Sequence, residues 1–165
     1  MALGRGLLTL AAAVALVGAS PPTIAAPPAC DRLVPHIETA AREHGVDAAL
    51  LAGIIAVESG FRTDVTSRSG ARGPMQIMPS TGRAMRCGAL DVPATNIACG
   101  ARLLARHLDH YDGRVLYALA AYRLGRRDPD RAFGARRPVA MTYVEKVVRA
   151  RARFLARGCA AWSRP

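Results

Sequence analysis

Apolar residues recur with helical spacing along almost the whole chain, and glycine or proline interrupts the pattern at intervals. Segments that alternate apolar and polar residues, as strands do, are hard to find. The length of 165 residues allows one domain with a substantial core and leaves no room for a second sizeable one. The pattern therefore predicts a mainly α fold, a cluster of about six helices.

Capping and breaking residues set the expected bounds of these helices. The first helix is expected from about Val34 to His44, with Pro35 in its first turn and Gly45 as its stop. The second follows Asp47 as N-cap and stops at Gly60. The later helices are expected over Pro79 to Arg86, Asn96 (as cap) to Tyr111, Arg114 to Gly125 and Pro138 to Arg157. Residues 61–73 are expected to form a polar loop with a small hairpin, and residues 126–137 a charged loop.

The first residues have the features of a secretory signal peptide. Arg5 precedes an apolar run from Leu7 to Ala19, which is too short to span a membrane as a helix. Small residues then occupy the positions that a signal peptidase reads when it cuts after Ala25. We therefore expect residues 1–25 to be a leader and residues 26–165 to be one mature domain, periplasmic or secreted and not integral to the membrane. An uncleaved anchor or a buried helix is the alternative.

Export changes the interpretation of the four cysteines, because an oxidising compartment favours disulfides over free thiols. The four are Cys30, Cys87, Cys99 and Cys159, which allow three pairings. We favour Cys87 with Cys99 as a short local loop, and Cys30 with Cys159, which joins the two ends of the mature domain. A zinc site is the rival, but no pair has the CxxC spacing typical of one.

The chain is strongly basic, with a formal net charge of +11, and Lys146 is its only lysine. Such a charge predicts attraction to a polyanion: nucleic acid, an anionic membrane surface, or a carboxylate-rich polymer such as peptidoglycan. Aromatic residues make up only 5% of the chain, which disfavours a protein that stacks single-stranded nucleic acid on rings. The leader argues against nucleic acid as well.

The candidate for catalytic chemistry is Glu58. It is the only acid between the Asp47 cap and Phe61, and it follows a strongly apolar helix that we expect to be buried. Burial and the negative end of the helix dipole both raise the pKa of a carboxyl, which suits a general acid. From spacing alone, a glutamate at the helix end that points into solvent remains equally open.

A second candidate is metal binding at His107 and His110, beside Asp109 and Asp112. No third ligand stands at a persuasive spacing, so we favour a solvated helix face and expect no metal and no cofactor.

Several ordered segments resemble the catalytic domain of soluble lytic transglycosylases. They are Glu58–Phe61, Gly70–Pro79, Asn96–Gly100, Ala120–Tyr122 and Tyr143–Val147. The resemblance spans nearly all of the mature chain. It implies a lysozyme-like helical domain with a short irregular or β-hairpin loop near the active site. It also implies non-hydrolytic cleavage of the bond between N-acetylmuramic acid and N-acetylglucosamine in peptidoglycan glycan strands, which leaves 1,6-anhydro-N-acetylmuramic acid ends.

The resemblance also implies roles for individual residues. Glu58 matches the family's single catalytic acid and base. The residues that match its substrate-binding positions are Ser67, Met75, Gln76, Asn96, Tyr122 and Tyr143. Among these, Met75 is expected to line the cleft, Asn96 fits equally well as a helix cap, and Tyr143 is the expected partner of Glu58.

Two residues depart from the family pattern. Pro74 stands where the family usually has leucine, and Arg123 stands where it usually has asparagine. A cation at position 123 is expected either to alter sugar recognition or to pair with a carboxylate of the peptide part of peptidoglycan.

Two other function classes stay open. A hydrolysing muramidase on the same fold would use Asp64 or another acid to activate water. A non-enzymatic basic wall-binding protein, or less favourably one that binds nucleic acid, has only the charge in its support. We expect a monomer. General wall turnover and a role beside secretion or conjugation machinery are both compatible with the sequence.

Overall fold

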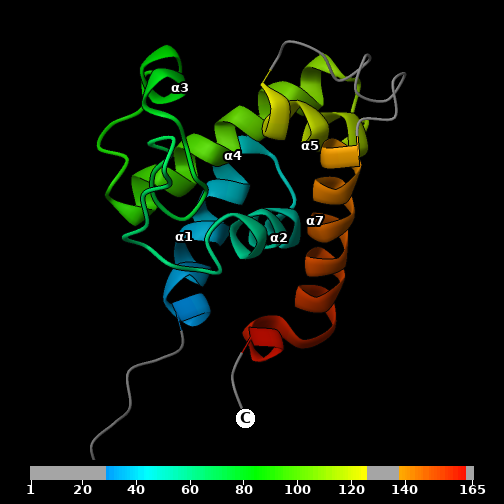
Figure 1. Cartoon of the computed structure of the whole chain (residues 1–165). Coiled ribbons are helices and arrows are strands. Elements are labelled where there is room, and N and C mark those ends of the chain that lie inside the picture. The colour runs from blue at the N-terminus through cyan, green and yellow to red at the C-terminus, as the bar shows by residue number, and fades with distance from the viewer. Residues whose placement is uncertain (1–28, 126–137, 163–165) are drawn as a thin grey trace, which may run out of the picture.

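The computed structural model describes residues 29–125 and 138–162 (Figure 1). The predicted leader, residues 1–25, and the predicted charged loop, residues 126–137, lie outside the described residues. The described part contains α1 (Ala29–His44), α2 (Ala48–Glu58), α3 (Pro79–Ala84), α4 (Pro93–His110), α5 (Val115–Leu124), α7 (Pro138–Arg157) and the 3₁₀ helix η1 (Gly158–Trp162). The prediction of a mainly helical fold is confirmed.

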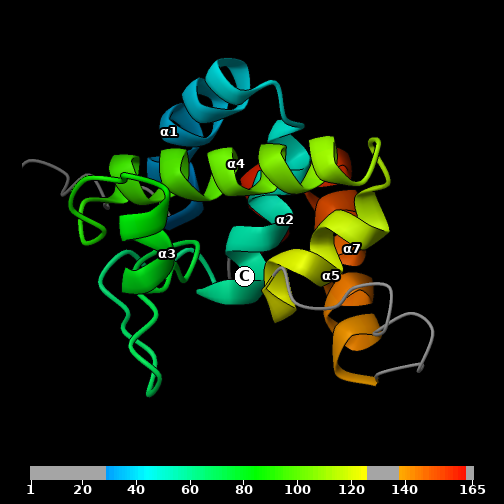
Figure 2. The ribbon, with the colours of Figure 1, turned by 90° about the horizontal axis from the view of Figure 1, so that it is seen from above.

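Helix α2 lies at the centre of the packing. Asp47 caps it, because its Oδ1 accepts a hydrogen bond of 2.8 Å from the Leu50 N–H. Every residue from Ala49 to Ile55 is buried, so the helix is apolar on all sides and must be enclosed by neighbours. In Figure 2, α2 lies between the loop with α3 on one side and the α5–α7 pair on the other. Glu58, the last residue of α2, therefore lies between these two parts.

Helices α2 and α7 run antiparallel in close contact. A Cβ atom on Gly53 would lie 2.9 Å from the Val147 carbonyl oxygen and 3.0 Å from the Arg151 backbone nitrogen, so only glycine permits this approach. At one end of the contact, Arg151 Nε donates to Asp47 Oδ2 at 3.1 Å. Burial acts to raise the pKa of Asp47, but the hydrogen bonds from Arg151 and Leu50 outweigh it and hold that pKa below its usual value. The other end of the contact brings Glu58 of α2 toward Tyr143 of α7.

Helix α1 begins five residues before the expected start, and Pro35 consequently lies inside the helix rather than in its first turn. A proline there removes one backbone hydrogen bond. The extension buries Cys30 and Leu33 in the core. Cys30 is bonded to Cys159 in η1, which fixes the first turns of α1 against the far end of the chain.

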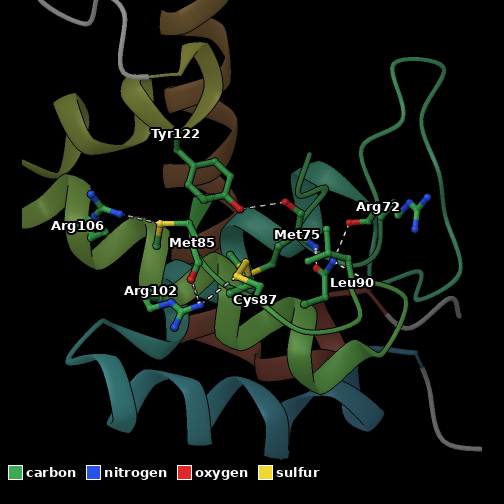
Figure 3. Close-up of a disulfide and its surroundings, with 10 residues drawn as sticks. Arg72, Met75, Met85, Cys87, Leu90, Arg102, Arg106 and Tyr122 are labelled. Carbon is green, nitrogen blue, oxygen red and sulfur yellow. Dashed lines mark hydrogen bonds between the residues drawn. A yellow bond between two sulfur atoms is a disulfide. The ribbon is translucent and has the colours of Figure 1, made fainter. Parts of the chain in front are cut away.

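The segment from Phe61 to Met78 is irregular, with single antiparallel bridges between Thr66 and Arg72 and between Arg72 and Ile77. It is therefore hairpin-like, as expected, and it projects beside α3 (Figure 2). The Cys87–Cys99 disulfide ties the end of the α3 region to α4. Figure 3 shows Arg102 of α4 pointing at this disulfide, where it donates to Cys87 Sγ at 3.1 Å and to the Met85 carbonyl oxygen. Both disulfides have the pairing that the sequence analysis favours.

Two expectations about α4 are wrong. The helix begins at Pro93 with Val92 at its N-cap, so Asn96 lies inside the first turns and does not cap the helix. His107 and His110 do not share a solvated face, because His107 is only 4% exposed in the core while His110 is exposed. Among the described helices, none is long and apolar enough to cross a lipid bilayer.

The Gly53 contact predicts that Gly53→Ala destabilises the protein. Alanine gains about 1 kcal/mol of helix propensity, but the added methyl group meets backbone atoms that side-chain motion cannot remove. We expect a net loss of about 1 to 3 kcal/mol in the free energy of unfolding, measured by urea denaturation. A variant as stable as the wild type would show that α2 and α7 separate without cost.

The two disulfides close chain segments of very different length, with sequence separations of 129 for Cys30–Cys159 and 12 for Cys87–Cys99. The chain-entropy model assigns about 5 kcal/mol to the longer loop and about 3 kcal/mol to the shorter. We therefore expect the serine double variant of the first pair to lose more unfolding free energy than that of the second. The reverse order in urea denaturation would contradict this account.

Candidate active site

Glu58 lies at the junction of two cavities. The first, here called the α7-side cavity, has a volume of about 390 Å³ and is lined by Val57, Glu58, Arg123, Pro138, Val139, Thr142, Tyr143 and Lys146. The second, the loop-side cavity, has about 510 Å³ and is lined by Glu58, Ser67, Arg68, Ser69, Ala71, Gln76, Met78, Tyr122 and Arg123. A third cavity of about 690 Å³, between α3, α4 and α5, shares Tyr122 with the loop-side cavity. The first two cavities share Glu58 and Arg123 as wall residues, so Glu58 faces both of them.

Glu58 is the only carboxylate among the described residues that line these three cavities. The other charged side chains on their walls are cationic: Arg68, Arg106, Arg123 and Lys146, with His107 also present. Asp64, the acid considered for activation of water, is exposed and lines none of the three. The geometry therefore offers one carboxyl group for chemistry.

The environment of Glu58 favours its protonated form. Burial raises the pKa of the carboxyl, and the nearby Tyr143 hydroxyl and the positive charge of Arg123 only partly oppose this, so the pKa stays above its usual value. The position at the C-terminal end of α2 acts in the same direction. A raised pKa is the shift that suits a carboxyl acting as a general acid.

Tyr143 is the aromatic residue whose hydroxyl acts on the pKa of Glu58. Its hydroxyl is buried and forms no hydrogen bond of standard geometry with the described residues, although it lies near enough to Glu58 to affect the pKa of both groups. Burial, and then the charge of Glu58, raise the pKa of Tyr143 well above its usual value, so it remains a proton donor. An unpaired buried hydroxyl beside a carboxyl leaves a hydrogen-bonding position open.

Tyr122 has a different role in the structure. Its hydroxyl donates to the Met75 carbonyl oxygen at 3.0 Å, so it links α5 to the loop (Figure 3). Its ring forms part of the wall of both the loop-side and the third cavity. Burial and the charge of Glu58 raise its pKa well above the usual value as well.

Ser67 and Gln76 lie opposite Glu58 on the wall of the loop-side cavity. Ser67 Oγ accepts from the Ala71 N–H and is 3.0 Å from Ser69 Oγ, which closes the tip of the loop. Gln76 has a positive φ of 49°, and its Nε2 donates to the carbonyl oxygens of Val65 and Gly73. Both side chains shape the loop and also face the cavity.

Met75 and Asn96 do not line any of these cavities. Both are 0% exposed, so the expectation that Met75 lines the cleft is wrong, and Asn96 lies beneath the loop. The Asn96 side chain accepts from the Met75 N–H at 2.9 Å and donates to the carbonyl oxygens of Arg72 and Leu90 at 2.8 Å. One amide thus joins three backbone positions of the loop region to α4.

Two glycines make room for this arrangement. A Cβ atom on Gly73, whose φ is +70°, would lie 2.4 Å from Asn96 Nδ2, and a Cβ atom on Gly100 would lie 2.3 Å from Met75 Sδ. The glycines of the Gly70–Pro79 and Asn96–Gly100 segments therefore permit close packing of the loop on α4.

Sequence reasoning did not identify several other residues on the cavity walls. Arg68, Ser69 and Met78 line the loop-side cavity, and Thr142 and Lys146 line the α7-side cavity. Lys146 was identifiable, because it lies three residues after Tyr143 and hence on the same face of α7.

Comparison with known families bears on these features. The family described as "Transglycosylase SLT domain" matches residues 35–141, more than half of the chain. The chain belongs to this family.

Individual curated proteins are also similar to this chain. The SLT chain is 39% identical over 89 residues to a transglycosylase of Enterobacteria phage PRD1, covering 54% of the chain and 33% of the phage protein. It is 32% identical over 96 residues to membrane-bound lytic murein transglycosylase F of Pseudomonas fluorescens, covering 54% of the chain and 20% of that protein. The chain thus spans a third or less of the length of these curated relatives.

The fold of the SLT chain also resembles a solved structure. The X-ray structure of an inactive glutamate-to-glutamine mutant of lytic transglycosylase Slt from Pseudomonas aeruginosa aligns with a TM-score of 0.65 and 24% sequence identity. The match covers 81% of this chain and 25% of that one. The lysozyme-like helical fold expected from the sequence is thereby confirmed.

The raised pKa of Glu58 predicts a pH-dependent stability. The native state holds the Glu58 proton more tightly than the unfolded state, so this carboxyl reduces stability as pH rises from its unfolded pKa through its native pKa. Glu58→Gln cannot lose a proton, and we expect the variant to gain stability relative to wild type over the pH range above about 4. Urea denaturation across this range measures the difference, and parallel curves would show that Glu58 is not perturbed by burial.

Proposed function

We propose that this SLT domain is a peptidoglycan lytic transglycosylase. It cleaves the glycosidic bond between N-acetylmuramic acid and N-acetylglucosamine without water and leaves a 1,6-anhydro-N-acetylmuramic acid end. The observation that carries the proposal is the single carboxyl, Glu58, which lines two adjoining cavities whose other charged wall residues are cationic. Membership of the SLT family and the similarity to known transglycosylases support it.

Glu58 acts first as an acid and then as a base. Its proton passes to the glycosidic oxygen, the bond between that oxygen and the anomeric carbon breaks, and positive charge develops on the sugar. The carboxylate then takes the proton of the sugar's own 6-hydroxyl, whose oxygen bonds to the anomeric carbon and closes the anhydro ring. The raised pKa supplies the protonated form for the first step.

One carboxylate is sufficient because the substrate supplies the nucleophile. Glycosidases that use water or an enzyme nucleophile typically need a second carboxylate on the other side of the bond. A hydrolysing muramidase through Asp64 is the second candidate, but the exposed position of Asp64 outside the three cavities does not favour it.

The other predicted site residues divide into two groups in this proposal. Ser67, Gln76, Tyr122 and Tyr143 bind sugar groups from the cavity walls, and the Tyr143 hydroxyl acts beside Glu58. Asn96 and Met75 act behind the loop by fixing the backbone that carries Gln76.

We also propose that the domain works outside the cytoplasm, in the periplasm or after secretion. The leader-like residues 1–25 and the two disulfides support this location, because disulfides persist in oxidising compartments. The net positive charge favours the anionic wall.

The decisive test is Glu58→Gln assayed on purified peptidoglycan. The variant keeps the size and hydrogen bonding of the side chain but has no transferable proton, so activity should fall by about 10²- to 10⁴-fold or more. Wild type should release fragments with 1,6-anhydro-N-acetylmuramic acid ends, which mass spectrometry identifies because they are one water lighter than hydrolysis products.

Glu145→Gln is the matched control, because Glu145 is exposed on α7, pairs with Arg149 at 3.5 Å and lines none of the three cavities. It should digest the wall as fast as wild type. Fragments with reducing ends would establish hydrolysis instead, and an unchanged rate for Glu58→Gln would remove Glu58 from the mechanism.

A further inference from the structure

Two cations stand beside the proposed acid in the α7-side cavity. Arg123 comes from α5 and Lys146 from α7, and both line this cavity together with Glu58. Arg123 also lines the loop-side cavity and lies close enough to Glu58 to act on its pKa. Two positive side chains beside one half-buried acid make this an anion-attracting cavity.

Neither cation is paired with a carboxylate in the described part of the chain. Several exposed arginines elsewhere do have such partners: Arg151 pairs with Asp47, Arg149 with Glu145, and Arg114 with Asp112. With respect to residues 29–125 and 138–162, Arg123 and Lys146 have donors available at the cavity wall, where a ligand carboxylate would complete the pair.

The ring of Tyr143 orders one of the two cations. The Arg123 guanidinium carbon lies 5.7 Å from the centroid of that ring. A guanidinium stacked on an aromatic face keeps its N–H donors in its own plane, free for two parallel bonds to a carboxylate. The side chain loses less conformational freedom on binding when it is already held in this way.

Part of the remaining wall is apolar, and Thr142 and Tyr143 add hydroxyl groups to it. Val57, Pro138 and Val139 line the same cavity, whose volume is about 390 Å³. Such a surface suits the small apolar side chains of a short peptide, and the cations suit its acidic groups. A strand without peptide carries its charge only on the lactyl carboxylate of N-acetylmuramic acid, directly beside the sugar ring, and amidation of that group leaves the strand without charge.

We propose that the α7-side cavity binds a free carboxylate of the peptide stem attached to the glycan, through Arg123 and Lys146, and that the enzyme therefore prefers strands that carry peptide. This rests on the proposed function and adds a specificity-determining pair to it. Of the two roles expected for a cation at position 123, the proposal assigns to Arg123 the pairing with a peptide carboxylate.

The test compares three soluble fragments of the same glycan length: one with free peptide stems, one with the stem carboxylates amidated, and one without peptide whose lactyl carboxylates are amidated. Wild type should show the lowest KM on the first. Arg123→Asn, which restores the residue usual in the family, should raise KM on that fragment by about 10- to 100-fold, since charged hydrogen bonds contribute about 1.5 to 3 kcal/mol. The other two fragments should change little.

Lys146→Gln should give a smaller rise on the same fragment, because an ammonium group is a single point charge without the guanidinium fork. Arg149→Gln is the matched control, since Arg149 is exposed on α7 and lines none of the cavities. It should leave the KM of all three fragments unchanged.

If Arg123→Asn raised KM equally on all three fragments and shifted the pH profile of activity, the proposal would be overturned. Arg123 would then act by adjusting the pKa of Glu58. Calorimetry with Glu58→Gln separates this outcome from failure of the proposed function, because binding needs no turnover. If the Glu58→Gln variant binds the free-stem fragment at least tenfold more tightly than the amidated fragment, the carboxylate site is supported even if wild type proves inactive. Equal affinities would refute the site.

Discussion

The contact between α2 and α7 at Gly53 is the constraint on which the active site depends. Backbone atoms of α7 lie within 3.0 Å of the position that a Cβ atom would occupy there, so the two helices are held at the shortest separation that the chain allows. Because the helices are antiparallel, fixing them at Gly53 and at the Asp47–Arg151 pair also fixes the distance between Glu58 and Tyr143. The acid and its hydroxyl neighbour are thus positioned by helix packing and need no flexible loop.

The opposite wall of the site is built in another way. It is a loop with little regular structure, and a few polar side chains replace the missing secondary structure. Asn96 on α4 forms hydrogen bonds with three backbone groups. Gln76 and Tyr122 form hydrogen bonds with other backbone carbonyl groups of the loop. Two of the segments that resemble the family, Gly70–Pro79 and Asn96–Gly100, build or support this loop, which explains why Asn96 and Met75 belong to the pattern without reaching the cavity surface.

Local rules were enough to predict most of the fold. The Asp47 cap follows from short-range chemistry, and so does the disulfide between Cys87 and Cys99. Burial of the helix that precedes Glu58 was predictable because that helix is apolar on all sides, but the sequence left a buried and a solvent-facing Glu58 side chain equally open. The burial of Asn96 and His107 was not predictable. The face of α4 that becomes buried depends on how the loop and α5 pack against it, and the spacing of apolar residues in α4 does not indicate this.

The Cys30–Cys159 bond has a consequence for the durability of the molecule. It turns the polypeptide between these residues into a covalent ring that contains nearly every helix described. A single proteolytic cut anywhere within that ring leaves two fragments still joined through sulfur, with their buried surfaces already in register. Loss of the protein then needs two independent events, a cut and a reduction, or two cuts. Among proteases outside the cell, damage to one peptide bond would be survivable for as long as the environment remains oxidising.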